Sequence, residues 1–186
     1  MVRRMIRTHR ATSLALALAS LLLVDAAWTA PAPAEPALAE ERWEETLRFV
    51  RETFPDVPQL STERLAELLE EDVEVVLLDA RSTREYATSH LQGAVQADSV
   101  RAAREVLSQR GEKPTVVVYC SVGYRSSRLA KRLRARGVES VFNLEGSLFK
   151  WANEGRPVYR GAEPVSSVHP FDADWGKLLD KTLHSE

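Results

Sequence analysis

The 186-residue sequence has only one cysteine, Cys120. A lone cysteine cannot form a disulfide within the chain, so its thiol is either a small core residue or a reactive group. The sequence also lacks internal repeats and any residue spacing typical of a metal site, including the segment around His169. These absences argue against a disulfide scaffold, a repeat architecture and a zinc module, and no metal or organic cofactor is implied.

Long hydrophobic runs are scarce. The apolar stretch Ala11 to Val24 is fourteen residues long, which is too short to cross a bilayer. Arginines precede it at positions 3, 4, 7 and 10, and an Ala/Pro-rich segment after it ends in the small-x-small pattern Ala37-Leu38-Ala39. We therefore predict that residues 1–39 are a cleaved export signal and that the mature protein is periplasmic or secreted. The alternative is an uncleaved membrane anchor, which Asp25 and the following prolines disfavour.

Neither sign of charge is in large excess, because 25 lysines and arginines stand against 27 aspartates and glutamates. Residues 1–39 hold four basic and two acidic side chains, so the remaining 147 residues hold 21 and 25, a net charge of −4. This mild acidity argues against a nucleic acid as partner. The length fits one domain of ordinary size, which buries enough surface to fold without disulfides.

Strand and helix patterns alternate along the rest of the chain. Short apolar runs predict strands at 73–79, 94–96, 115–119 and 138–143, and amphipathic patterns predict helices at 41–53, from 61, at 83–89, 99–110 and 124–136. In the helix from Ser61, we expect Leu65, Leu68 and Leu69 to form the buried stripe. The alternation predicts an α/β fold in which a parallel sheet has helices on both faces.

Cys120 follows the strand 115–119 and precedes the helix that begins near Tyr124. The carboxyl ends of parallel strands are where open α/β sheets bind ligands. Gly123 permits a tight turn, so the amides of Ser121 to Arg125 and the helix dipole would favour a thiolate. Arg125 would add positive charge and bind an anionic donor. The alternatives are a cysteine that only packs and an arginine that is only solvated.

Four segments carry a family resemblance, and they occur in this order: Asp79-Ala80-Arg81 with Glu85-Tyr86 and His90-Leu91-Gln92-Gly93-Ala94, then Tyr119-Cys120-Ser121-Val122-Gly123-Tyr124-Arg125-Ser126, then Asn143-Leu144-Glu145-Gly146, then Trp151. From about Leu60 to Tyr159 the chain resembles the single-domain rhodanese family of sulfurtransferases. The resemblance implies a rhodanese-like five-stranded parallel sheet with helices on both faces. It also implies that Cys120 is catalytic and that the loop Ser121, Val122, Gly123, Tyr124 and Arg125 binds the substrate.

The resemblance implies a double displacement through a Cys120 persulfide. Sulfane sulfur would pass from thiosulfate or a persulfide to cyanide, a thiol or an acceptor protein. The alternative is a sulfur-carrier, sulfide-sensing or docking module without turnover. The domain organisation predicted is an export signal at 1–39, an N-terminal helix and linker at 40–58, a rhodanese domain at 59–160 and a C-terminal extension at 161–186 that packs on the domain or receives a partner.

Some positions depart from the family pattern. Ser121 stands where thiosulfate-using members often carry a basic residue, which argues against thiosulfate as the physiological donor. Ser89 and Ser147 replace glycines, and we expect them to affect loop shape without contacting the chemistry. Cysteine phosphatases share the strand-loop-helix cysteine but place five residues between cysteine and arginine, whereas four separate Cys120 from Arg125.

Three further polar residues receive mainly structural predictions. Asp79 and Arg81 end a strand where they could line the active-site mouth, although a structural ion pair is the favoured role. His90 is expected to be a hydrogen-bonded structural histidine rather than a general base. The basic helix 124–136 is expected to bury Leu129 and Leu133 and to expose its cations.

Overall fold

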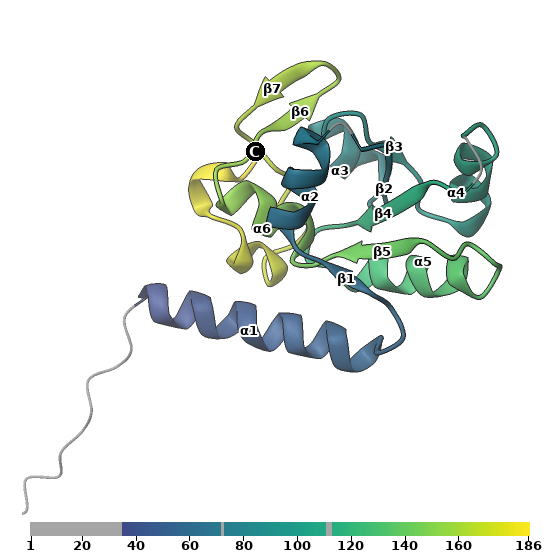
Figure 1. The fold of residues 1–186 in the computed structure, drawn as a ribbon. Coiled ribbons are helices and arrows are strands. Elements are labelled where there is room, and N and C mark those ends of the chain that lie inside the picture. Colours follow the sequence, from purple (N-terminus) through teal and green to yellow (C-terminus); the bar gives the residue numbers. More distant parts are fainter. Residues whose placement is uncertain (1–34, 72, 111–112) are drawn as a thin grey trace, which may run out of the picture. The chain divides into compact units, whose positions relative to one another are not determined.

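The structure, a computed structural model, describes residues 35–71, 73–110 and 113–186 (Figure 1). The predicted export signal at 1–39 therefore lies almost wholly outside the described residues, and Glu35 to Ala39 form the start of helix α1 (Glu35–Thr53). Among the described helices, none combines the length and the apolarity needed to cross a membrane.

A five-stranded parallel sheet forms the centre of the described fold, with strand order β1-β5-β4-β2-β3. In chain order the strands are β1 (Gln59–Leu60), β2 (Val75–Asp79), β3 (Val95–Gln96), β4 (Thr115–Tyr119) and β5 (Val141–Leu144). The central strand β4 pairs with β2 and β5, and its residues from Val116 to Tyr119 are fully buried. The near-continuous apolar runs arise because both faces of the sheet are covered.

Alternate residues of β4 belong to two separate cores. Val117 and Tyr119 pack with helices α2 (Thr62–Glu70) and α6 (Ser147–Asn153) on one face. Val116 and Val118 pack on the other face with α4 (Val100–Leu107), α5 (Tyr124–Arg134) and the end of α1. Successive strand side chains point to opposite faces, so one strand supplies both cores. The fold predicted from the alternation and the resemblance is confirmed.

Several element boundaries differ from the predictions. Helix α1 begins at Glu35 rather than Glu41, and the strand expected from residue 138 begins at Val141. Leu65 is fully buried, but Leu69 is 43% exposed in the last turn of α2, so the expected three-leucine stripe is wrong at that position. Short helix α3 (Thr83–Thr88) begins as predicted, with Ser82 as its N-cap.

The C-terminal segment packs on the domain, which was one of its two predicted roles. The hairpin of β6 (Val158–Arg160) and β7 (Glu163–Val165) is joined to the domain by paired backbone hydrogen bonds of 2.8 Å between His90 and Tyr159. Two 3-10 helices follow, η1 (Trp175–Leu178) and η2 (Lys181–Leu183). Val168, Leu178 and Leu179 are buried in the same core as α2 and α6, and η1 also contacts α1.

Candidate functional site

Cys120 lies immediately after β4, at the carboxyl edge of the sheet, and is only 1% exposed. The turn from Cys120 into α5 has Gly123 as the helix N-cap, with φ of +114°. A Cβ atom at this position would lie 3.2 Å from Asn143 Nδ2, so both the backbone conformation and the space favour glycine. The sequence prediction for this turn therefore matches the geometry that the structure gives it.

Two donors contact the thiol directly. The Gly123 amide donates to Cys120 Sγ at 3.2 Å, and the Ser126 hydroxyl donates to it at 3.4 Å. Burial raises the pKa of Cys120, but the positive charge of Arg125 and the hydrogen bonds from Ser126 and Gly123 outweigh it, so the pKa lies below its ordinary value. This environment favours the thiolate, the nucleophilic form.

The backbone of Cys120 is held by Ser147, a residue predicted to affect loop shape without contacting the chemistry. Ser147 Oγ accepts the Cys120 amide hydrogen bond at 3.1 Å and donates to the Leu144 carbonyl at 3.0 Å. Its φ of +53° places a non-glycine residue in the left-handed region. The contact is with the backbone of Cys120, so Ser147 acts on the shape of the loop, and its hydroxyl connects β5 to the nucleophile.

Arg125 is partly exposed and forms an ion pair. Its guanidinium donates to Glu85 at 2.6 and 2.9 Å and to Ser121 Oγ at 2.9 Å. Burial raises the pKa of Glu85, but the hydrogen bonds from Arg125 and Ser82 lower it by more, so the pKa is about 2. The carboxylate is therefore ionised near neutral pH. Glu85 is held in this position by α3, where it forms a capping box with Ser82. The spacing Ser82-x-x-Glu85 is the sequence pattern of a capping box, which the predictions did not use, and no local pattern indicates the Arg125 partner.

The thiol lies at a cavity of about 340 Å³. Of the predicted loop, four residues line this cavity with Cys120, namely Ser121, Val122, Tyr124 and Arg125. Three aromatic residues from outside the loop complete the lining, namely Phe49, Phe171 and Trp175. We call Phe49, Tyr124, Phe171 and Trp175 the aromatic rim. Sequence reasoning missed its members from α1 and from the C-terminal segment, because only the fold brings these distant segments to the loop.

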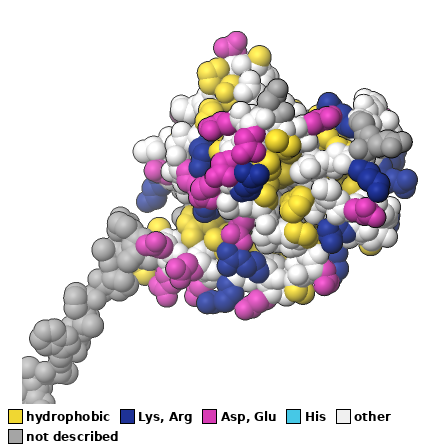
Figure 2. Space-filling view, in the orientation of Figure 1, with side chains coloured by type: hydrophobic (Ala, Val, Ile, Leu, Met, Phe, Trp, Pro, Cys, Tyr) yellow, Lys and Arg dark blue, Asp and Glu magenta, His cyan; other side chains and the backbone are white. Residues whose placement is uncertain are grey.

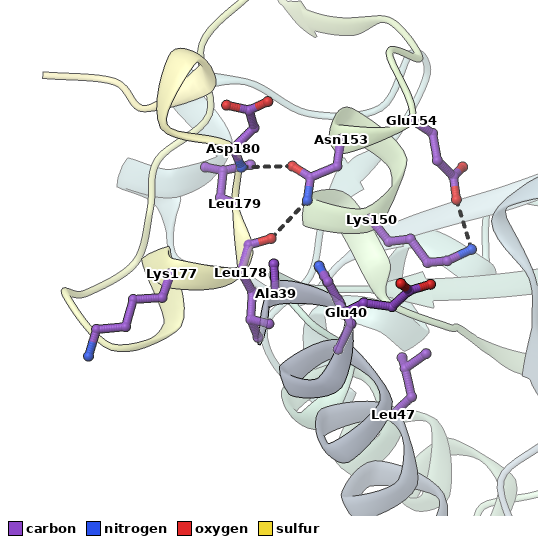
Figure 3. Close-up of a pocket in the computed structure, with 11 residues that line it drawn as sticks. Ala39, Glu40, Leu47, Lys150, Asn153, Glu154, Lys177, Leu178, Leu179 and Asp180 are labelled. Atoms are coloured by element: carbon purple, nitrogen blue, oxygen red, sulfur yellow. Dashed lines mark hydrogen bonds and ion pairs between the residues drawn. The ribbon is translucent and has the colours of Figure 1, made fainter. Parts of the chain in front are cut away.

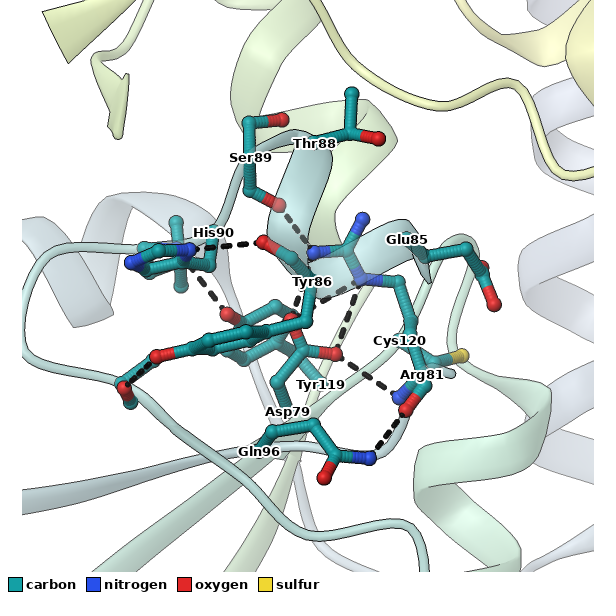
Figure 4. A network of polar contacts seen from close by, with 12 residues as sticks. Asp79, Arg81, Glu85, Tyr86, Thr88, Ser89, His90, Gln96, Tyr119 and Cys120 are labelled. Atoms are coloured by element: carbon teal, nitrogen blue, oxygen red, sulfur yellow. Dashed lines mark hydrogen bonds and ion pairs between the residues drawn. The ribbon is translucent and has the colours of Figure 1, made fainter. Parts of the chain in front are cut away.

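Asp79 and Arg81 are both fully buried and form an ion pair with Nη2–Oδ2 at 2.7 Å (Figure 4). They do not line the cavity at Cys120, so the suggestion that they form the active-site mouth is wrong and they hold a structural ion pair instead. Arg81 also donates to the Ser89 carbonyl, which anchors the end of α3. His90 Nδ1 lies 2.9 Å from the Tyr86 carbonyl, and the two rings stack at 4.0 Å, a structural arrangement.

A second cavity, of about 600 Å³, lies between α1, α6 and the C-terminal segment (Figure 3). Lys150 pairs with Glu154 at 2.7 Å, and Asn153 bonds to the backbone of Leu178 and Asp180. The side chains that line it include no thiol or hydroxyl. Among the described residues, no group of three or more His, Cys, Asp or Glu side chains is placed to hold a metal ion. The cavity at Cys120 is therefore the candidate reaction site.

Comparisons with known proteins support the same region. Residues 61–154 match the family model described as "Rhodanese-like domain". An uncharacterized protein of Synechocystis sp. is 32% identical over 64% of this chain and 66% of its own length. A sulfurtransferase of Allochromatium vinosum is 29% identical over 55% of this chain and 94% of its own length. A tRNA uridine(34) hydroxylase of Cronobacter sakazakii is 29% identical over 59% of this chain but only 33% of its own length.

A solved structure, that of a thiosulfate sulfurtransferase from Pseudomonas aeruginosa, gives a TM-score of 0.56 at 22% identity. The match covers 69% of this chain and 25% of that chain. At this identity the likeness concerns the fold. The chain spans about two thirds of the Synechocystis protein and about a third of the hydroxylase.

Proposed function

Because the chain belongs to the rhodanese-like domain family, we propose that it is a sulfurtransferase that uses Cys120 as nucleophile and persulfide carrier. The observation that supports this best is the environment of the thiol. Cys120 has a lowered pKa, accepts hydrogen bonds from Gly123 and Ser126, and lies at a cavity at the carboxyl edge of a parallel sheet.

The reaction proceeds in two displacements. The Cys120 thiolate attacks the outer sulfur of a donor, the donor's sulfur–sulfur bond breaks, and the leaving group departs with the electron pair. The resulting Cys120 persulfide then yields its outer sulfur to cyanide or a thiolate, which regenerates the Cys120 thiolate. The Gly123 amide and the Ser126 hydroxyl donate to Cys120 Sγ, so they stabilise the thiolate that attacks in the first half and leaves in the second.

A sulfur carrier without turnover is the second candidate, because the chain holds no second cysteine to resolve the persulfide. The burial of Cys120 favours a small donor over a docking protein. The thiol is 1% exposed at a cavity, whereas a carrier that serves a protein partner would present it in an open mouth.

Intact mass and product release test the proposal. The protein is treated with thiosulfate or a thiosulfonate and then with cyanide, and thiocyanate is followed over time, with Cys120→Ser as control. We expect one added sulfur atom, its loss to cyanide, repeated thiocyanate release, and neither signal in the variant. An adduct that forms but does not turn over would favour the carrier, and the absence of any sulfur adduct would refute both candidates.

We also propose that the protein is exported, on the strength of the basic and apolar segments of residues 1–39. Mass spectrometry of the protein from the periplasmic or culture fraction should give a chain that begins at Glu40. An intact N-terminus in the cytoplasmic fraction would contradict export.

A further inference from the structure

The cavity at Cys120 is mainly apolar, although the reaction moves a charged sulfur. Its lining consists of the aromatic rim together with Val122, and the polar members are Cys120, Ser121 and Arg125. Its volume of about 340 Å³ exceeds what a small anion requires. For scale, a cavity of about 150 Å³ is enough to hold benzene. The cavity therefore has space for an apolar group attached to the transferable sulfur.

Among the described residues that line the cavity, Arg125 is the one that carries a charge, and this charge is already engaged. Both of its terminal nitrogens donate to the ionised Glu85, and Phe171 covers its guanidinium with the ring centroid 4.5 Å away. Arg84 is exposed and lies outside the lining. When Cys120 is a thiolate, the group of Arg125, Glu85 and Cys120 has a net charge of −1. A dianion such as thiosulfate would therefore be repelled by this net charge. A monoanion with an apolar body would experience less repulsion.

Three of the four rim residues, Phe49, Phe171 and Trp175, lie on segments outside the matched region 61–154. Phe49 comes from α1 and stacks on Tyr124 with centroids 5.6 Å apart, and Trp175 comes from η1, which packs against α1. Phe171 has φ of +69°, a strained conformation for a phenylalanine, yet its side chain is 42% exposed. Core burial does not explain the strained backbone of Phe171. In this conformation its side chain lines the cavity and covers the Arg125 guanidinium.

We propose that the aromatic rim selects sulfur donors that carry an apolar alkyl or aryl group, such as organic thiosulfonates or organic persulfides, over thiosulfate. This inference rests on the proposed sulfurtransferase function and names its substrate class. For a thiosulfonate, the Cys120 thiolate attacks the outer sulfur and the sulfur–sulfur bond breaks. The sulfinate leaves with the electron pair and the Cys120 persulfide anion remains, so no oxidant, reductant or proton is needed. The organic group rests against the rim during this step.

Donor kinetics test the proposal, with cyanide as acceptor so that every donor gives thiocyanate. The donors are thiosulfate, methanethiosulfonate and benzenethiosulfonate, and kcat/KM for the donor reports its own half of the double displacement. The two thiosulfonates have the same charge and both release a sulfinate, so they differ chiefly in the size of the apolar group and less in reactivity. We expect kcat/KM to rise from thiosulfate to methanethiosulfonate to benzenethiosulfonate.

The three donors also differ in their intrinsic reactivity toward a thiolate. Variants of the rim residues therefore test whether the rim itself causes the preference. Phe171→Ala and Trp175→Ala should lower kcat/KM for benzenethiosulfonate about tenfold, which is the effect of losing a buried aromatic contact. The kcat/KM for thiosulfate should change by less than about twofold in these variants. In Phe171→Ala it should stay within that range or rise, because that variant uncovers Arg125. Leu69→Ala, which removes an exposed side chain of α2 away from the cavity, is the matched control and should leave every donor unchanged within about twofold.

The outcomes separate the two proposals. If the rim variants lose kcat/KM equally for all three donors, or lose none for benzenethiosulfonate, the proposed selectivity of the rim is overturned. The proposed sulfur transfer would still stand. If none of the donors adds a sulfur atom to Cys120 in the wild-type protein, the sulfurtransferase function itself fails and the inference fails with it.

Discussion

At the scale of single residues, Arg125 acts on Cys120 as a fixed charge. The sequence predicted an arginine that binds an anionic donor, but both arms of its guanidinium contact Glu85. Its charge still lowers the pKa of Cys120. Arg125 therefore stabilises the thiolate while offering little free positive charge to a second anion, which follows from its bidentate contact with Glu85.

Ser147 is the other residue whose role depends on a contact remote in sequence, and it gives a testable prediction. In Ser147→Ala the buried amide of Cys120 loses its acceptor while the left-handed backbone strain remains, so the free energy of unfolding should fall by about 2 kcal/mol. In Ser147→Gly the same hydrogen bonds are lost but the strain is relieved, so the loss should be about 1 kcal/mol.

Urea unfolding of both Ser147 variants measures these differences. A glycine variant as unstable as the alanine variant would show that the positive φ stores no strain. An alanine variant as stable as the wild type would show that the hydroxyl does not support the Cys120 amide.

At the scale of elements, the active-site loop is fixed where β4 ends and α5 begins, and Gly123 is the residue on which the turn depends. Gly123→Ala forces a side chain into φ of +114° and places a Cβ 3.2 Å from Asn143 Nδ2. We expect the free energy of unfolding to fall by about 1–3 kcal/mol. The alkylation of Cys120 should also slow, because the Gly123 amide that contacts Sγ is displaced.

Gly137→Ala is the matched control for this prediction. Its φ is +86°, but no atom lies within 4 Å of the added Cβ. The free energy of unfolding of Gly137→Ala should fall by about 1 kcal/mol through backbone strain alone. The alkylation rate of Cys120 should stay unchanged. Equal alkylation rates in both variants would contradict the role given to the Gly123 amide. Urea unfolding and iodoacetamide trapping supply the two measurements.

The aromatic rim is also an element-scale feature, since α1, the first residue of α5 and the C-terminal segment each supply part of it. Tyr124 belongs to the predicted substrate-binding loop, but neither α1 nor the C-terminal segment is identifiable as a binding element by its own pattern. In the sequence, Phe49 lies on an amphipathic helix, and Phe171 and Trp175 lie in an apolar tail. Only the packing of η1 against α1 brings them to the same cavity.

At the scale of the whole molecule, acidic and basic side chains are interspersed over the face shown in Figure 2, in keeping with a net charge of −2. The stability of such a protein depends on pH through individual buried groups rather than through overall charge. Glu85 is the clearest of these, because its pKa is about 2 in the folded protein against 4.5 for an unperturbed glutamate.

The sign of this dependence follows from linkage. A carboxyl group whose pKa is lowered by folding stabilises the protein fully above pH 4.5, and this contribution is lost as the pH falls toward 2. We therefore expect the free energy of unfolding to decrease across this range. Glu85→Gln should be less stable at pH 7 and should show a smaller decrease. Urea titrations at several pH values measure both, and an identical pH slope in the variant would contradict the assignment to Glu85.

The sequence by itself determined the parallel α/β fold, the position of Cys120 at the end of β4, and the tight turn at Gly123. These features depend on local patterns, namely apolar runs, helix caps and a glycine, which act between residues close in the chain. The tertiary structure alone decided that Glu85 engages Arg125, that Ser147 supports Cys120, and that an aromatic rim surrounds the thiol. Those contacts join residues 27 to 40 positions apart or more, and no local pattern specifies which distant side chains a fold brings together.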